Sequence, residues 1–74
     1  MNKRILKNLS NTQRVVVELV NIKGEDRVEL RKEYRKSADL DWVSSKGITI
    51  PVDSISKLVS ILTEIRDKEV GGNE

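Results

Sequence analysis

Two consecutive runs of alternating apolar and polar residues constrain the fold of this chain most strongly. The first run, Gln13 to Ile22, is rich in β-branched side chains, and the second extends from Arg27 to Lys36. β-Branched residues with a period of two are typical of strands in a pleated sheet. Between the runs lies Lys23-Gly24-Glu25-Asp26, in which the glycine favours a tight turn. The two runs therefore predict a β-hairpin with a short loop.

The segments after the hairpin predict the rest of one small domain over residues 13–68. A second turn is expected at residues 37–41, a brief third strand at 42–45 and a fourth strand at 46–50. Pro51 fits the start of a helix, and the apolar residues from Ile55 to Ile65 recur at intervals of three and four, which gives one apolar stripe. The predicted fold is α+β, ordered ββββα: a curved, four-stranded antiparallel sheet backed by one C-terminal α-helix. Residues 1–12 are expected to be a basic flexible arm or a short pairing segment, and residues 69–74 a polar tail.

The shortness of the chain predicts a second copy. A chain of 74 residues buries only about 60% of the surface that its unfolded form exposes. One helix covers one face of a sheet, which leaves Val16, Val20 and Ile22 and the flank of the helix stripe to be covered by something else. Because twofold homodimers are the commonest oligomers, we expect a homodimer.

The composition argues against an enzyme. The chain has no histidine and no cysteine, the residues that supply the usual general base, the thiol nucleophile and the favoured ligands of zinc and copper. Serines do lie beside Lys46 and Lys57, but such clusters are typical of solvated polar positions. Asp39 and Asp41 suit a turn better than a cation site. We expect no catalysis, no cofactor, no metal and no small-molecule substrate.

The sequence also predicts where the protein works. The basic N-terminus is not followed by an apolar stretch of signal-peptide or membrane-spanning length, and the lack of cysteine fits a reducing compartment. We therefore expect an intracellular protein, cytoplasmic or nucleoid-associated, with no membrane partner.

The charges are unevenly divided along the chain. Residues 1–36 hold ten Lys and Arg against five acidic residues, whereas residues 37–74 hold four against seven. This asymmetry favours a basic surface on the N-terminal half and an anionic partner, although a solvated surface with chance clustering explains it about as well.

The two aromatic residues, Tyr34 and Trp42, fall among these cations. Aromatic rings interleaved with Lys and Arg on a sheet are what a single-strand-binding surface needs, because bases stack on the rings while the cations neutralise phosphates. The alternative is that Trp42 caps the core and that Tyr34 is a strand residue. The candidate nucleic-acid contacts are Arg14, Lys23, Arg31, Lys32, Tyr34, Lys36, Trp42 and Lys46.

The middle of the chain resembles the positive cofactor four family of transcriptional coactivators. The resemblance rests on Lys23-Gly24, on Val28-Glu29-Leu30-Arg31-Lys32-Glu33-Tyr34, and on Lys46-Gly47-Ile48-Thr49-Ile50 before an amphipathic helix, and it spans about residues 13–68. It implies a homodimer whose sheets bind single-stranded DNA, or melted duplex, largely without regard to sequence, in transcription, replication or repair. RNA is a further candidate ligand. By position it implies that Lys23 and Lys46 hold phosphates, that Arg31 holds a phosphate or stacks on a base, and that Tyr34 stacks.

The chain departs from that family at several positions. Ile22 stands where an aromatic residue can precede the Lys-Gly turn, Glu25 and Ser45 stand where basic residues are common, and Trp42 occupies a place that is often basic. A serine-rich regulatory arm is absent, so the resemblance fits a prokaryotic or phage version. The competing hypothesis is a protein-interaction dimer whose basic sheet face binds an acidic protein.

Overall fold

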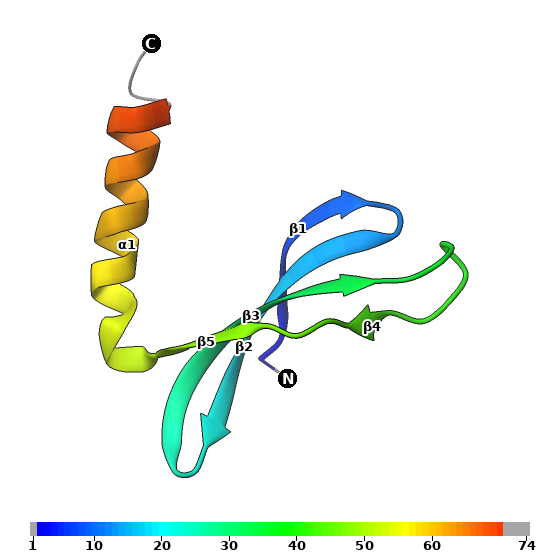
Figure 1. Ribbon diagram of the computed structural model, residues 1–74, viewed down its shortest axis with the longest axis horizontal. Coiled ribbons are helices and arrows are strands. Elements are labelled where there is room, and N and C mark those ends of the chain that lie inside the picture. Colours follow the sequence, from blue (N-terminus) through cyan, green and yellow to red (C-terminus); the bar gives the residue numbers. More distant parts are fainter. Residues whose placement is uncertain (1, 71–74) are drawn as a thin grey trace.

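The computed structural model describes residues 2–70 and contains an antiparallel sheet followed by one C-terminal helix, which confirms the predicted fold class (Figure 1). The strands are β1 (Arg4–Ser10), β2 (Gln13–Ile22), β3 (Glu25–Tyr34), β4 (Val43–Ser44) and β5 (Ile48–Pro51). A 3-10 turn, η1 (Val52–Ser54), leads into α1 (Ile55–Glu64), which continues as a π-helical segment, η2 (Ile65–Val70). Of the tail predicted at residues 69–74, the first two residues belong to η2 and the others lie outside the described range.

The predicted hairpin is the centre of the sheet. β2 and β3 pair over their whole length, from Gln13 opposite Tyr34 to Ile22 opposite Glu25. Only Lys23 and Gly24 connect them, and both have positive φ angles, 54° and 85°. This is the geometry of a two-residue hairpin turn whose twist matches that of the strands. The loop is therefore two residues shorter than the four-residue turn we predicted.

The N-terminal segment differs from the flexible arm predicted for residues 1–12. Arg4–Ser10 form strand β1, which pairs with β2, so the pairing-segment alternative holds for these residues. The pairing shifts register twice, between Ile5 and Lys7 and between Asn8 and Ser10. Each shift is a β-bulge, which inserts an extra residue and breaks the alternation that would have marked the strand in the sequence.

Strands β4 and β5 are two halves of one interrupted edge strand. Both pair with β3, β4 near its end and β5 near its start. Gly47 lies in the interruption, and a Cβ there would be 2.4 Å from the carbonyl oxygen of Leu30 and 2.7 Å from Cβ of Arg31. Only glycine allows this close backbone approach. The predicted third and fourth strands thus share one edge of β3, and β1 supplies the fourth row of the sheet.

Helix α1 does not back the sheet, contrary to our expectation. It rises from the end of β5 and stands away from the strands (Figure 1). Its stripe is open to solvent: Val59 is 55% exposed and Leu62 53% exposed. The helix itself forms as predicted because its apolar residues share one face, but the described part of the chain leaves Val59 and Leu62 of that face uncovered.

The core is correspondingly small. Val16 is the one fully buried apolar side chain among the described residues. The radius of gyration is 14.9 Å, whereas a compact domain of this length has about 11 Å. No helix in the described part of the chain is long and apolar enough to cross a membrane.

Candidate nucleic-acid interface

The strand register places the glutamates of the hairpin on one face of the sheet and Lys32 and Tyr34 on the other. Residues that pair across antiparallel strands point to the same face, and successive residues point to opposite faces. The first face, here called the glutamate face, holds all four glutamates of the hairpin: Glu18, Glu25, Glu29 and Glu33. The opposite face, here called the lysine face, holds Arg4, Lys7, Lys32 and Tyr34. The candidate residues therefore do not form one surface.

Glu33 is the centre of an ion-pair network on the glutamate face. Its carboxylate is 2.9 Å from Nζ of Lys3 and 2.7 Å from the Arg14 guanidinium, and it accepts a hydrogen bond from the Ser44 hydroxyl at 3.2 Å. The residue is only 2% exposed. Burial alone raises the pKa of a carboxyl, but the hydrogen bonds from Lys3, Arg14 and Ser44 outweigh it and lower the pKa of Glu33 from 4.5 to about 2.

Arg31 belongs to the same network and is held by three carboxylates. Its guanidinium lies 2.8 Å from Glu18, 2.7 Å from Glu29 and 3.5 Å from Glu33, and its side chain is 13% exposed. The hydrogen bond to Glu18 raises the pKa of Arg31, burial lowers it, and the bond and charge of Glu29 add to the rise. An arginine in this position is already neutralised, so a phosphate would have to displace glutamates to reach it.

Two arginines make cation–π contacts with the indole ring of Trp42. The guanidinium carbons of Arg14 and Arg35 lie 4.2 Å and 4.0 Å from the centroid of its ring, within cation–π distance. Arg35 also donates to the backbone carbonyl of Asn11. The ring thus holds the segment before β4 against the strands. This position agrees better with the hypothesis that Trp42 caps the core than with the hypothesis that it stacks on bases.

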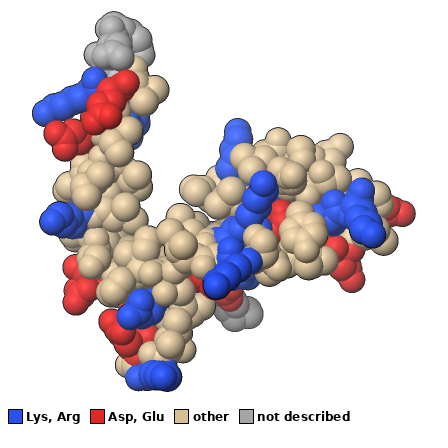
Figure 2. Space-filling model, in the orientation of Figure 1, with Lys and Arg blue, Asp and Glu red and all other residues tan. Residues whose placement is uncertain are grey.

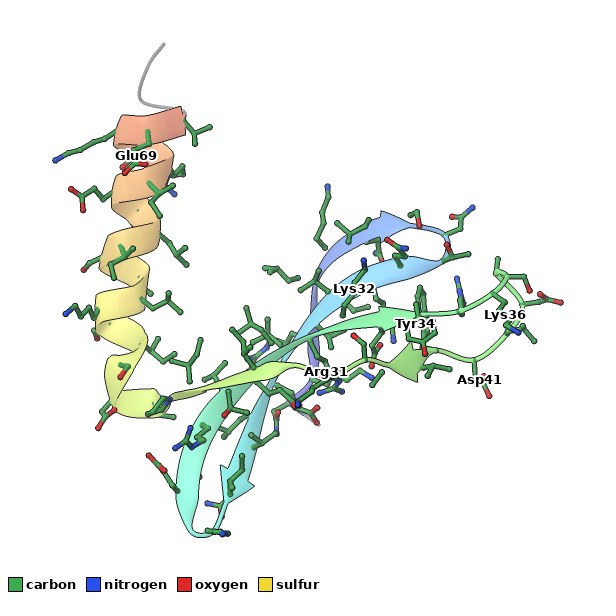
Figure 3. All side chains as sticks on the ribbon, in the orientation of Figure 1. Arg31, Lys32, Tyr34, Lys36, Asp41 and Glu69 are labelled. Carbon is green, nitrogen blue, oxygen red and sulfur yellow. The ribbon has the colours of Figure 1, made fainter. Side chains whose placement is uncertain are left out.

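On the lysine face, by contrast, the ring of Tyr34 and the side chain of Lys32 are exposed. Tyr34 is 45% exposed, and Lys32 precedes it by two residues on β3, so both side chains project from the same face. Figure 3 shows Lys32, Tyr34 and Lys36 following one another along the outer part of β3 and the turn beyond it. Lys32 makes no ion pair within the described chain and is exposed. Figure 2 shows Lys and Arg side chains in a band across this part of the sheet.

The other candidates lie in turns. Lys23 is at the tip of the hairpin, about 30 Å along β3 from Tyr34 at the usual rise per residue. Lys36 follows β3, and Lys46 lies in the interruption between β4 and β5. All three are exposed. Lys36 is close enough in sequence to extend the Lys32–Tyr34 surface, whereas Lys23 is at the opposite end of the sheet.

Three residues that determine the charge of the two faces were not among the candidates predicted from the sequence. Arg4 and Lys7 fall on the lysine face because residues 4–10 form a strand, and Glu33 is the buried partner of three cations. A glutamate two residues after Arg31 was visible in the sequence, but its burial depends on the register and on the position of Lys3.

The surface holds no enclosed site in the part of the chain that the structure describes. No pocket is detected, and residues 2–70 contain no group of three or more acidic side chains arranged to hold a metal ion. Comparison of the chain with models of protein families, with curated proteins and with solved structures found no match.

Proposed function

We propose that this protein binds single-stranded nucleic acid, without sequence preference, on the outer half of its sheet. The observation that supports the proposal most is the exposed ring of Tyr34 beside the unpaired Lys32, on the face that carries none of the hairpin's glutamates. A tyrosine ring stacks on any base, and a lysine neutralises any phosphate, so neither contact reads sequence.

The arrangement favours a single strand over a duplex. The face of a base is available to a protein ring only when the base is not stacked within a helix. Melted duplex DNA and RNA satisfy the same requirement as single-stranded DNA.

The resemblance to the positive cofactor four family supports this function through Tyr34, which stands where that family carries a stacking aromatic. It does not support every contact equally. Arg31, which the resemblance implies as a contact, is neutralised by Glu18 and Glu29 in this chain. Binding is therefore expected to depend on Tyr34 and Lys32 more than on Arg31.

We further propose that the binding unit is a homodimer. The chain exposes 5912 Å², whereas a folded monomer of 8.4 kDa exposes about 4,600 Å², an excess of about 1,300 Å². Covering that excess on two chains would bury about 2,600 Å², within the range of obligate homodimers. The exposed stripe of α1, with Val59 and Leu62, is the surface that a second copy covers.

A fluorescence anisotropy titration with a labelled oligo-dT tests the function. We expect tight binding at 50 mM salt that weakens steeply by 200 mM, and much weaker binding of a duplex of the same length. The variant Lys32→Ala/Tyr34→Ala should lose affinity, whereas the control Lys57→Ala, an exposed lysine of α1, should not.

Two competitors separate this function from binding of an acidic protein. An abasic oligonucleotide of equal length keeps the phosphates but offers no base to Tyr34, so it should compete poorly. Poly-glutamate should compete still less. If poly-glutamate displaced oligo-dT as well as unlabelled oligo-dT does, or if the wild-type protein bound no oligonucleotide at 50 mM salt, the nucleic-acid proposal would be wrong.

A further inference from the structure

We propose that strand β1 is part of the nucleic-acid site, with Arg4 and Lys7 as additional phosphate contacts, and that the bound strand crosses the lysine face from β3 to β1. This inference rests on the proposed function and specifies which face of the sheet carries it. Neither residue was a candidate from the sequence, and the family resemblance, which begins near residue 13, does not reach them.

The register places the lysines of two strands in one row. Val15 on β2 pairs with Lys7 of β1 on one side and with Lys32 of β3 on the other. Two strand spacings separate Lys7 from Lys32, which is about 10 Å. Arg4 lies one row further along β1, opposite Val17. The three cations and the Tyr34 ring thus share one face across the full width of the β1–β3 sheet.

A β-bulge is what turns Lys7 to this face. Ile5 pairs with Val16, but the next pair is Lys7 with Val15, so Leu6 is the inserted residue. Without the insertion, Lys7 would stand opposite Arg14 and point to the glutamate face. Bulges re-aim side chains in this way and are frequent at sheet edges and next to active sites. Here the bulge keeps Lys7 away from Glu33 and leaves it exposed.

Electrostatics favour the lysine face over its opposite. Arg4, Lys7 and Lys32 form no ion pair within the described chain. On the glutamate face, by contrast, Arg14 and Arg31 are each paired with carboxylates. A phosphate approaching the lysine face meets free cations, whereas one approaching the opposite face meets glutamates.

The contribution of β1 is measured from the salt dependence of oligo-dT binding. Each phosphate contact of a single strand adds about 0.7 to the slope of log K against log salt, which is about 5-fold in affinity at 0.1 M salt. Lys7→Ala should therefore weaken binding about 5-fold. Arg4→Ala/Lys7→Ala should weaken it about 25-fold and reduce the slope by about 1.4.

A swap of two neighbouring residues provides the matched control. The variant Lys7→Asn/Asn8→Lys keeps composition and net charge but moves the lysine to Asn8, which pairs with Arg14 and points to the glutamate face. It should lose as much affinity as Lys7→Ala. Circular dichroism of each variant checks that the sheet is retained.

The outcomes distinguish this inference from the function on which it rests. If the swap variant and Lys7→Ala both bound with wild-type affinity and slope while Lys32→Ala/Tyr34→Ala did not, β1 would lie outside the site although the protein binds nucleic acid. If the swap variant bound as well as the wild type while Lys7→Ala did not, net charge rather than the face would govern binding. Either result would overturn the inference.

Discussion

Replacing Glu33 by glutamine is expected to destabilise the protein in a pH-dependent way. The pKa of Glu33 is about 2 in the fold against 4.5 for an unperturbed carboxyl, which corresponds to about 3 kcal/mol of stability. Because the pKa is lowered on folding, this contribution is present above pH 4.5 and is lost as the pH falls toward 2. Glu33→Gln removes it at every pH and leaves Lys3, Arg14 and Arg31 without their shared carboxylate.

Urea unfolding followed by far-ultraviolet circular dichroism, at one fixed protein concentration, measures the effect. At pH 7 the free energy of unfolding of Glu33→Gln should lie about 3 kcal/mol below that of the wild type, and the gap should close as the pH falls from 4.5 to 2. Glu64→Gln is the matched control, since Glu64 is exposed and makes only a 3.8 Å contact with Lys68. A gap of unchanged size between pH 6 and pH 2.5, or no gap at pH 7, would refute the assignment of Glu33 as the centre of the network.

Four other variants test the stacking ring, the role of Trp42, the close approach at Gly47 and the dimer contact. Tyr34→Ala should weaken binding of oligo-dT and of mixed-sequence oligonucleotides alike, by about 10-fold, whereas Tyr34→Phe should retain it; anisotropy titration decides, and a loss confined to one sequence would contradict the stacking role. Trp42→Ala should lower the free energy of unfolding, measured in urea, by about 1–2 kcal/mol, the value of two cation–π contacts. It should weaken oligo-dT binding less than Tyr34→Ala does. If Trp42→Ala weakened binding more than Tyr34→Ala, the stacking role would belong to Trp42. Gly47→Ala should destabilise by more than about 1 kcal/mol because its Cβ meets the Leu30 carbonyl, and a melting temperature equal to that of the wild type would contradict the close approach. Leu62→Glu should yield monomers in sedimentation equilibrium, and a persistent dimer would exclude the α1 stripe as the contact.

The hairpin was predictable because its signals are local. Alternating side chains in residues 13–22 and 27–36, with Gly24 between them, specify two strands and a turn. The turn has two residues rather than the four predicted, which moves each cross-strand partner by two positions. A shift of two preserves the face to which each side chain points, so the faces followed from the sequence while the partners of Glu33 and Arg31 did not.

The pairing of β1 and the packing of α1 depended on information that the sequence pattern does not hold. The sequence did not decide between a flexible arm and a pairing segment for residues 1–12, because the two bulges of β1 interrupt the alternation of its side chains. The stripe of α1 was predicted, but its packing against the sheet was wrong because what an amphipathic helix covers depends on the surfaces offered to it, including those of other chains.

For the candidate site, the sequence predicted the faces to which side chains point but not their ion-pair partners. Lys32 and Tyr34 lie on an exposed face, as expected of a binding surface. Arg14, Arg31 and Trp42 looked equally available in the sequence. In the structure, glutamates form ion pairs with the two arginines. The guanidinium groups of Arg14 and Arg35 lie over the indole ring of Trp42. Whether a cation is free depends on which carboxylate the register brings within reach, and the sequence alone did not supply that register.

Protection of individual lysines by bound oligo-dT shows whether the lysine face is where the nucleic acid lies. The protein is acetylated with an amine-specific reagent, with and without saturating oligo-dT, and the modification of each lysine is quantified by peptide mass spectrometry. We expect slower acetylation of Lys7 and Lys32 in the complex and an unchanged rate at Lys57. Unchanged rates at Lys7 and Lys32 while the oligonucleotide is bound would exclude the lysine face as the binding surface.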